Sequence, residues 1–244
     1  MENLVQIVLS ALAVLLILTI HEYSHAYAAY KLGDNTAKNL GRLSLNPLKH
    51  LDPFGALCMI LFHFGWAKPV PINARNFKNP KRDFAITALA GPLSNMVFAF
   101  ISAFFILLIR SQYSAVVEKN AFFTQLILNL YTFLVLFHQI NIGIGLFNLI
   151  PIPPLDGSRI LNVILPPKYY FGIMKYERKI YLGLIIWLAF GDVVKRAVLS
   201  VPFIAANPIL SFLAGIFSLS DMLGYVIVWL SNAMLSFWQL LPFL

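Results

Sequence analysis

The stretch LVQIVLSALAVLLILTIHEYSH, residues 4–25, joins an uncharged apolar run to a cluster of ionisable side chains. Residues 4–20 contain no Asp, Glu, Lys or Arg, and a helix built on this run can cross the hydrocarbon core of a bilayer. His21 and His25 follow at a spacing of four, so both imidazoles lie on one helix face, with Glu22 beside them. Ionisable groups at membrane depth are costly and mark functional sites. The stretch therefore predicts a membrane helix that carries chemistry near its end.

The composition of the whole chain is that of a membrane protein. Of its 244 residues, 59% are hydrophobic and 11% are charged, whereas soluble domains have about half and about a quarter. We therefore expect an all-α polytopic membrane protein, a single domain over residues 1–244 with about five to six membrane segments. Its single cysteine, Cys58, excludes an intramolecular disulfide and a cysteine-rich zinc site, so metal ligands must be His and carboxylate.

Three stretches are predicted to span the membrane within a core of about residues 4–165. They are residues 4 to about 30, residues 84–109 and residues 122–149. Gly33 is expected to end the first, and Gly91-Pro92 to open the second. Residues 54–66 are also apolar, but 13 residues give a helix of only about 20 Å against a core about 30 Å thick. We expect this element to be re-entrant or interfacial.

The positive charges predict the orientation of these spans. Lys and Arg are concentrated in loops between apolar stretches, so the formal charge of +8 indicates membrane topology rather than nucleic-acid binding. Basic loops on both sides of residues 54–66, and again over residues 151–179, belong on the cytoplasmic side. The weakly charged connection 110–121 then faces outward. The first and third spans both end at the cytoplasmic face, which predicts that the histidine pair and Asp156 lie at one depth.

About residues 180–244 are expected to add two or three membrane segments. Residues 180–191 are apolar but short, whereas residues 197–220 and 222–244 are uncharged and long enough to span. Pro202 and Pro208 can break the first of these two stretches.

A histidine pair of this kind indicates a metal centre. In the HExxH pattern the two histidines bind one zinc ion and the glutamate, which points off their face, acts as a base for hydrolysis. A catalytic zinc takes three protein ligands and leaves one position for water, so a third ligand is needed. Asp156 is the first candidate, because it follows a long apolar helix and the stiff Pro153-Pro154 pair, and Gly157 permits a tight turn after it. Asp34 and Asp52, in the loop after the first helix, are alternatives.

Several motifs occur in a consistent order within about residues 10–165. They are His21-Glu22-Tyr23-Ser24-His25, Gly41-Arg42-Leu43-Ser44-Leu45-Asn46-Pro47 with Lys49-His50-Leu51-Asp52-Pro53, Ala67-Lys68-Pro69-Val70, Ala90-Gly91-Pro92-Leu93-Ser94-Asn95, and Phe147-Asn148-Leu149-Ile150-Pro151-Ile152-Pro153-Pro154-Leu155-Asp156-Gly157. Together they resemble the site-2 protease family of intramembrane zinc metalloproteases, in its compact prokaryotic form without a PDZ or CBS module. Residues 180–244 resemble no family in this way.

The resemblance implies an activity and a set of site residues. It implies zinc bound by His21, His25 and Asp156, with Glu22 as general acid and base. It implies hydrolysis of peptide bonds within or next to a substrate's transmembrane segment, near the cytoplasmic face of a prokaryotic cell membrane. Asn148 and Pro154 are implied to position an unwound substrate strand. The partners expected from this reading are a membrane-protein substrate and the lipid bilayer, with no nucleic acid.

The competing hypothesis is a membrane scaffold or transporter-like protein that keeps the zinc site without proteolysis. Glu22 argues against it, because a purely structural zinc needs no base and prefers four protein ligands. Other polar residues are expected to serve structure: His138 and Asn141 by hydrogen bonds between helices, and Asn95 by offering its amide to a neighbouring helix. His50 is expected to shape the cytoplasmic loop.

Overall fold

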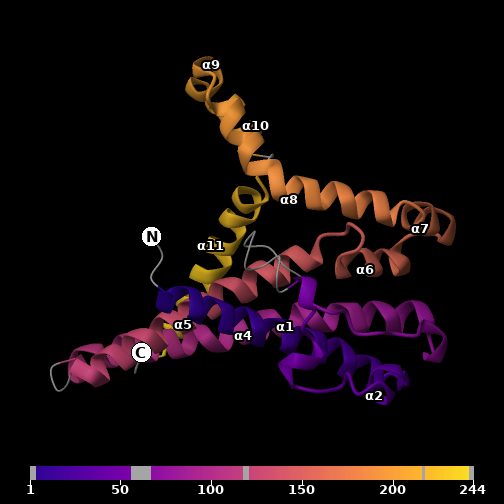
Figure 1. Ribbon diagram of the computed structural model, residues 1–244, viewed down its shortest axis with the longest axis horizontal. Helices are drawn as coiled ribbons and strands as arrows, with labels where there is room; N and C mark the ends of the chain where they lie inside the picture. The colour runs from indigo at the N-terminus through magenta and orange to yellow at the C-terminus, as the bar shows by residue number, and fades with distance from the viewer. Residues whose placement is uncertain (1–3, 56–66, 118–120, 216–217, 242–244) are drawn as a thin grey trace.

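The computed structural model describes residues 4–55, 67–117, 121–215 and 218–241, and these residues form an all-helical protein without a sheet. Three helices are long and apolar enough to cross a membrane: α1 (Leu4–Lys31), the Pro80–Gln112 part of α4 (Pro80–Val117), and α5 (Ala121–Leu149). They pack against one another as the centre of the molecule (Figure 1). The predicted number and order of spans within the N-terminal core are therefore confirmed.

Helices α1 and α4 run antiparallel. In the middle of α1, Ala13 and Ile17 are fully buried in a cluster against which Phe98 of α4 packs. Two turns further along α1, His25 contacts Thr87, which precedes Phe98 in α4. Helix α1 ends at Lys31, and Gly33 follows with a φ of 108°, a left-handed conformation that glycine adopts without strain. The end of α1 is therefore where the sequence predicts it.

Helix α4 is longer at both ends than predicted. It begins at Pro80, where a proline costs no helical hydrogen bond, and the Asp83 carboxylate accepts from the backbone N–H of Asn79. Residues 110–117 contain neither Gly nor Pro, so the helix continues through most of the connection expected at 110–121. The prediction that Gly91-Pro92 opens this span was wrong, because Pro92 lies inside the helix.

The loop between α1 and α4 contains short helical turns and buried polar side chains, among them His50. It contains α2 (Thr36–Asn39) and two short 3-10 helices, η1 (Pro47–Lys49) and η2 (Ala74–Asn76). The ring of His50 is bonded to the carbonyl of Ser44 at 2.7 Å, which confirms that it shapes the loop. An isolated antiparallel bridge joins Leu51 to Ala67. The expected re-entrant element at 54–66 lies, except for its first two residues, outside the described residues.

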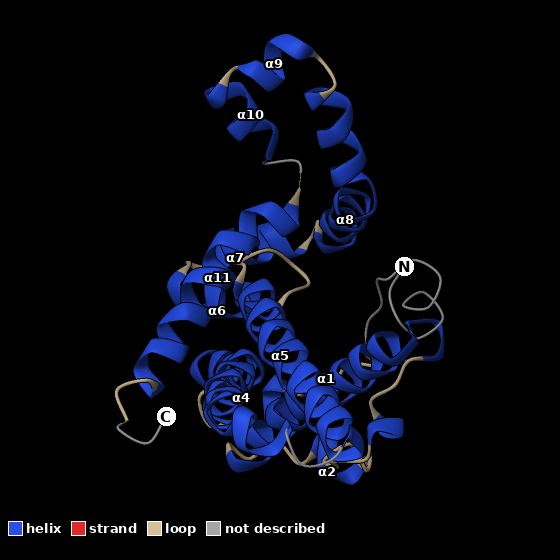
Figure 2. Cartoon of the chain, turned by 90° about the vertical axis from the view of Figure 1, so that its left-hand side faces the viewer, coloured by secondary structure: helices blue, strands red, loops and turns tan. Residues whose placement is uncertain are grey.

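Six helices follow α5: α6 (Asp156–Ile164), α7 (Pro167–Met174), α8 (Glu177–Leu199), α9 (Pro202–Ala206), α10 (Pro208–Gly215) and α11 (Leu219–Trp238). Pro202 and Pro208 each start a new short helix, so residues 197–220 do not form one span. Helices α9 and α10 stand away from the central helices, whereas α11 returns to pack on α4 and α5 (Figures 1 and 2).

Candidate metal centre

His21 and His25 project from the same face of α1 into the protein. Each residue is only 5% exposed. Their Nε2 atoms are 3.0 Å apart, and the rings meet edge to face. The spacing of four residues on one helix therefore brings two nitrogen lone pairs to one point, as the sequence predicts.

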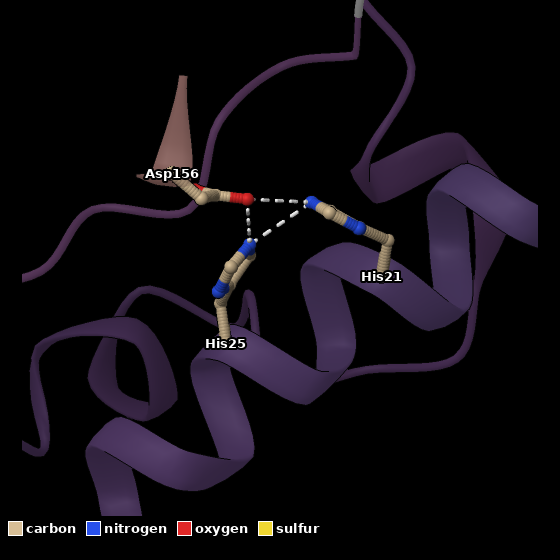
Figure 3. Close-up of side chains that lie close together, drawn as sticks. All are labelled: His21, His25 and Asp156. Carbon is tan, nitrogen blue, oxygen red and sulfur yellow. Dashed lines mark hydrogen bonds and ion pairs between the residues drawn. The ribbon is translucent and has the colours of Figure 1, made fainter. Parts of the chain in front are cut away.

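Asp156, the first residue of α6, reaches this point directly after the segment that leaves α5. Its Oδ2 lies 3.2 Å from the Nε2 of His21 and 3.2 Å from the Nε2 of His25 (Figure 3). In the part of the chain that the structure describes, these three residues are the one group of His, Cys, Asp and Glu side chains arranged to hold a metal ion. The end of the first span and the loop after the third thus meet.

The two alternative aspartates are engaged elsewhere. The Asp34 carboxylate is fully buried and accepts hydrogen bonds from the backbone of Thr36 and Asn73 and from the side chain of Asn76. Burial acts to raise the pKa of this carboxyl, but these hydrogen bonds outweigh it and hold the pKa below its ordinary value. Asp52 accepts from the backbone N–H of Gly55 at 2.9 Å. Neither carboxylate belongs to the His21, His25 and Asp156 group.

Close backbone packing holds Asp156 in place. The backbone N–H of Leu155 donates to the carbonyl of Ile152 at 2.9 Å, and the Ser158 hydroxyl donates to the carbonyl of Leu155 at 2.7 Å. Gly157 does not form the turn that the sequence suggested, because it lies within α6. Its role is close approach: a Cβ atom there would lie 2.3 Å from the carbonyl oxygen of Leu149 at the end of α5.

The Nε2 atoms of His21 and His25 and the Oδ2 of Asp156 are spaced to coordinate a metal ion tetrahedrally. With zinc–ligand bonds of about 2.1 Å, ligand atoms of a tetrahedral site are about 3.4 Å apart, close to the 3.0, 3.2 and 3.2 Å found here. A buried carboxylate beside two imidazole nitrogens is the donor set that zinc prefers.

Helix α4 supports the histidine pair from behind. The Nδ1 of His25 is bonded to the backbone carbonyl of Thr87 at 2.7 Å, which fixes Nδ1 as the donor and leaves the Nε2 lone pair for a metal. Gly91 lies against both rings, since a Cβ atom there would be 2.3 Å from the Nε2 of His25 and 2.6 Å from the Cε1 of His21. Sequence reasoning missed both roles.

Glu22 lies off the metal-facing surface of α1, as its position predicts. Its Oε2 accepts a hydrogen bond of 2.8 Å from the backbone N–H of Val70. The segment that carries Val70 is held by the buried Arg42, whose guanidinium donates to the carbonyl of Lys68 at 2.7 Å. The loop after α1 therefore fixes the carboxylate next to the histidine pair.

The predictions for the polar residues of α5 are confirmed for His138 but not for Asn141. His138 makes the predicted interhelical bonds, to the carbonyl of Ala99 at 2.8 Å and to the hydroxyl of Ser231 at 2.9 Å. The prediction for Asn141 was wrong, because its amide donates within α5, to the carbonyl of Phe137. Asn148 likewise donates to the carbonyl of Ile144 in its own helix.

Comparison with known proteins places this architecture in a family. A model of peptidase family M50 matches residues 9–170. YwhC of Bacillus subtilis (strain 168), named as a candidate zinc metalloprotease, is 48% identical over 149 residues, which are 61% of this chain and 65% of YwhC. No solved structure gives a significant match.

Two more distant relatives are also named as zinc metalloproteases. Rip2 of Mycolicibacterium smegmatis, also named as a candidate zinc metalloprotease, is 28% identical over 63% of this chain and 56% of Rip2. The zinc metalloprotease MJ0392 of Methanocaldococcus jannaschii is 31% identical over 70% of this chain and 39% of that protein. The chain thus spans less than two thirds of the length of each of these relatives. Because the family model covers more than half of the chain, and its match contains all three residues of the candidate metal centre, this protein belongs to peptidase family M50, the site-2 protease family.

Proposed function

We propose that this protein is a zinc-dependent endopeptidase that hydrolyses peptide bonds within or next to the transmembrane segments of other membrane proteins. The observation that carries the proposal is the buried triangle of His21 Nε2, His25 Nε2 and Asp156 Oδ2, with the Glu22 carboxylate alongside. Membership of peptidase family M50 supports it independently.

In this proposal His21, His25 and Asp156 bind Zn²⁺ and Glu22 is the general base and acid. Zinc in such a site polarises a peptide carbonyl and makes water more acidic. Glu22 takes the proton of the attacking water and later delivers it to the leaving amine. The Val70 N–H holds Oε2, and Oε1 has no hydrogen-bond partner among the described residues, so Oε1 is the oxygen that receives the proton.

Substrate positioning is assigned to Asn148 and Pro154. Asn148 lies eight residues before Asp156 in the sequence, and Pro154 lies two residues before it, so both are close to the third proposed zinc ligand along the chain. Asn148 sits one residue before the end of α5, where its amide is able to exchange the bond to Ile144 for one to an extended substrate backbone. The segment around residues 54–70 is assigned to the substrate entry.

We assign the protein to a prokaryotic cell membrane as a multi-pass protein, with the metal centre near the cytoplasmic side. The basic loops occur where α1 and α5 end, which supports this orientation. Beyond the three apolar spans, α11 has 20 residues and packs on α4 and α5, which supports a further membrane segment. A single membrane-embedded domain over residues 1–244, with about five to six membrane segments, remains our expectation.

The decisive experiment compares zinc content and peptide cleavage in the purified full chain and three variants. Wild type is reconstituted with a pool of single-span peptides, and cleavage is followed by mass spectrometry. Glu22→Gln is expected to keep zinc but to lose cleavage by about 10²-fold or more, because a general base contributes about that much. Asp156→Ala is expected to lose zinc. Asp34→Ala is the matched control, because its carboxylate serves the loop, and it is expected to keep zinc.

Each alternative has its own signature in this experiment. Cleavage that survives Glu22→Gln would defeat the proteolytic mechanism. Stoichiometric zinc in Asp156→Ala would reassign the third ligand. Zinc bound by wild type without cleavage of any peptide would favour the non-proteolytic scaffold.

A further inference from the structure

The two histidines of the metal centre differ in how their second ring nitrogen is used. The Nδ1 of His25 is bonded to the carbonyl of Thr87. The Nδ1 of His21 is buried and has no hydrogen-bond partner among the described residues. Histidines that bind metals almost always donate this second N–H to a carboxylate, a carbonyl or a water, which fixes the tautomer and the ring orientation. His21 therefore requires a partner that the described protein groups in contact with it do not supply.

The side-chain amide of Asn95 in α4 also lacks hydrogen-bond partners among the described residues. It is fully buried, and neither its Oδ1 nor its Nδ2 is hydrogen-bonded to any described residue. An unsatisfied buried polar group costs about 1–3 kcal/mol, so both ends of this amide would weaken the fold unless they bind something. Asn141 in α5 is equally buried but donates to the carbonyl of Phe137, which shows that burial of an amide in this bundle does not by itself leave it unpaired.

The register of α1 against α4 brings these two groups to the same region. Thr87, Gly91 and Asn95 are spaced by four residues and share one face of α4. Thr87 meets His25, and Gly91 meets the rings of both histidines. The helices are antiparallel, and Phe98 packs against the buried cluster that contains Ala13 and Ile17, so Asn95 falls between the levels of His21 and Ile17.

Helix α5 closes this region from the third side. A Cβ atom at Gly145 would lie 3.3 Å from the Cβ of Asn95, so Asn95 also lies against α5. Pro92 lies inside α4 and has no N–H, so the carbonyl of Ala88, one turn earlier in the helix, lacks its usual helical donor. This carbonyl is a further hydrogen-bond acceptor on the same side of α4. Polar groups collected in this way are those that hold buried water, which typically makes about three hydrogen bonds.

We propose that Asn95 binds a buried water molecule that accepts the Nδ1–H of His21, so that Asn95 positions this metal ligand as Thr87 positions His25. This inference rests on the proposed zinc centre but adds a residue and a water site to it. Asn95 touches neither the metal nor the substrate, and its effect is transmitted through the orientation of the His21 ring.

The test measures metal binding by the full chain in detergent micelles, without any substrate. Zinc affinity is obtained by competition with a chelator, and the ligand field is read from the visible absorption of the Co²⁺-substituted protein. Asn95→Ala and Asn95→Leu are expected to weaken zinc binding by about 10- to 100-fold, the usual effect of losing such a partner. Asn95→Ser, which keeps a hydroxyl and leaves room for water, is expected to recover much of the affinity. Asn141→Ala is the matched control and is expected to bind zinc as wild type does.

The outcomes separate this inference from the proposed function. Wild-type affinity in Asn95→Leu would overturn the inference while leaving the zinc centre intact. Equal weakening in Asn141→Ala and Asn95→Ala would also overturn it, because the loss would then reflect general loosening of the bundle. If Asn95→Ala does not fold, Asn95→Ser and Asn95→Leu still decide, because leucine has the branched shape of asparagine without its hydrogen-bonding groups, and equal zinc affinity in the two variants would overturn the inference. No metal bound by wild type would remove the centre and this inference together.

Discussion

At the scale of single residues, the absence of a side chain at Gly91 decides how closely α4 approaches the two imidazoles. Alanine there would place its Cβ 2.3 Å from the Nε2 of His25. The ring cannot simply move away, because Thr87 holds its other nitrogen and Asp156 lies in front of it. Gly91→Ala is therefore expected to weaken zinc binding by about 10-fold or more, since overpacking costs about 1–3 kcal/mol. Chelator competition measures this change directly.

A glycine with open space where a Cβ atom would be added supplies the control for this prediction. Gly183 lies in α8, and no atom is found within 4 Å of a Cβ built on it. Gly183→Ala is expected to leave zinc binding unchanged and to raise stability by about 0.5–1 kcal/mol, because alanine is the better helix former. If Gly91→Ala bound zinc as tightly as Gly183→Ala, the close contact described here would not govern the site.

The site residues differ in how far they could be predicted from the sequence. His21, Glu22 and His25 could be predicted because their relation is local and fixed by helix geometry. Asp156 could be proposed because basic loops set the side on which each span ends. The roles of Thr87, Gly91 and Val70 could not be predicted, because they depend on contacts between residues far apart in the sequence and on the exact helix register. Val70 is 48 positions from Glu22, and Thr87 is 62 positions from His25.

At the scale of elements, Asp34 ties the end of α1 to the segment before α4. Its carboxylate accepts from the backbone of Asn73 at 2.7 Å and from the amide of Asn76 at 2.7 Å. Asp34→Asn is expected to destabilise the protein by about 1–3 kcal/mol, because an amide N–H would face N–H donors. Thermal unfolding at neutral pH measures this loss.

The same carboxylate predicts a pH dependence with a definite sign. Burial raises the pKa of Asp34, but the hydrogen bonds from Thr36, Asn73 and Asn76 prevail and lower it from the ordinary value of 3.8. A carboxyl with a lowered folded-state pKa adds stability above its unfolded pKa, and this stability is lost as the pH falls through the folded pKa. The difference in stability between wild type and Asp34→Asn should therefore be full at neutral pH and shrink below about pH 4. Asp52→Asn, which keeps a side-chain oxygen to accept the Gly55 N–H, should show a smaller effect; an equal effect would contradict a special role for Asp34.

At the scale of the whole molecule, local pattern predicted the three spans of the core but not the C-terminal arrangement. Residues 4–20 and 122–149 contain no Asp, Glu, Lys or Arg and are mostly apolar, so the first and third spans follow from composition. Helix α8 continues through Asp192, Lys195 and Arg196 because charged side chains interrupt an apolar run but do not end a helix. The path of the chain after α8 depends on where Pro202 and Pro208 start new helices and on the docking of α11, which is set by tertiary contacts.

The docking of α11 depends on two polar contacts with the core. The Nδ1 of His138 faces the carbonyl of Ala99, so its Nε2 is the acceptor for the Ser231 hydroxyl at 2.9 Å. The indole N–H of Trp238 donates to the carbonyl of Phe100 at 2.8 Å, and its ring packs on that of Phe100. Ser231→Ala and Trp238→Phe each remove one hydrogen bond while keeping the apolar contact. Each is expected to cost about 0.5–1.5 kcal/mol.

Hydrogen exchange along the chain tests this prediction. The amides of α11 should exchange faster in both single variants, by about 2- to 10-fold, while those of α1 and α4 around the metal centre keep their protection, because α11 opens locally. Ser236→Ala is the matched control, since Ser236 is an exposed serine on the same helix. Faster exchange around His21 and His25 in Ser231→Ala would instead show that α11 stabilises the metal centre itself, and the C-terminal helix would then be part of the catalytic unit and not an attachment to it.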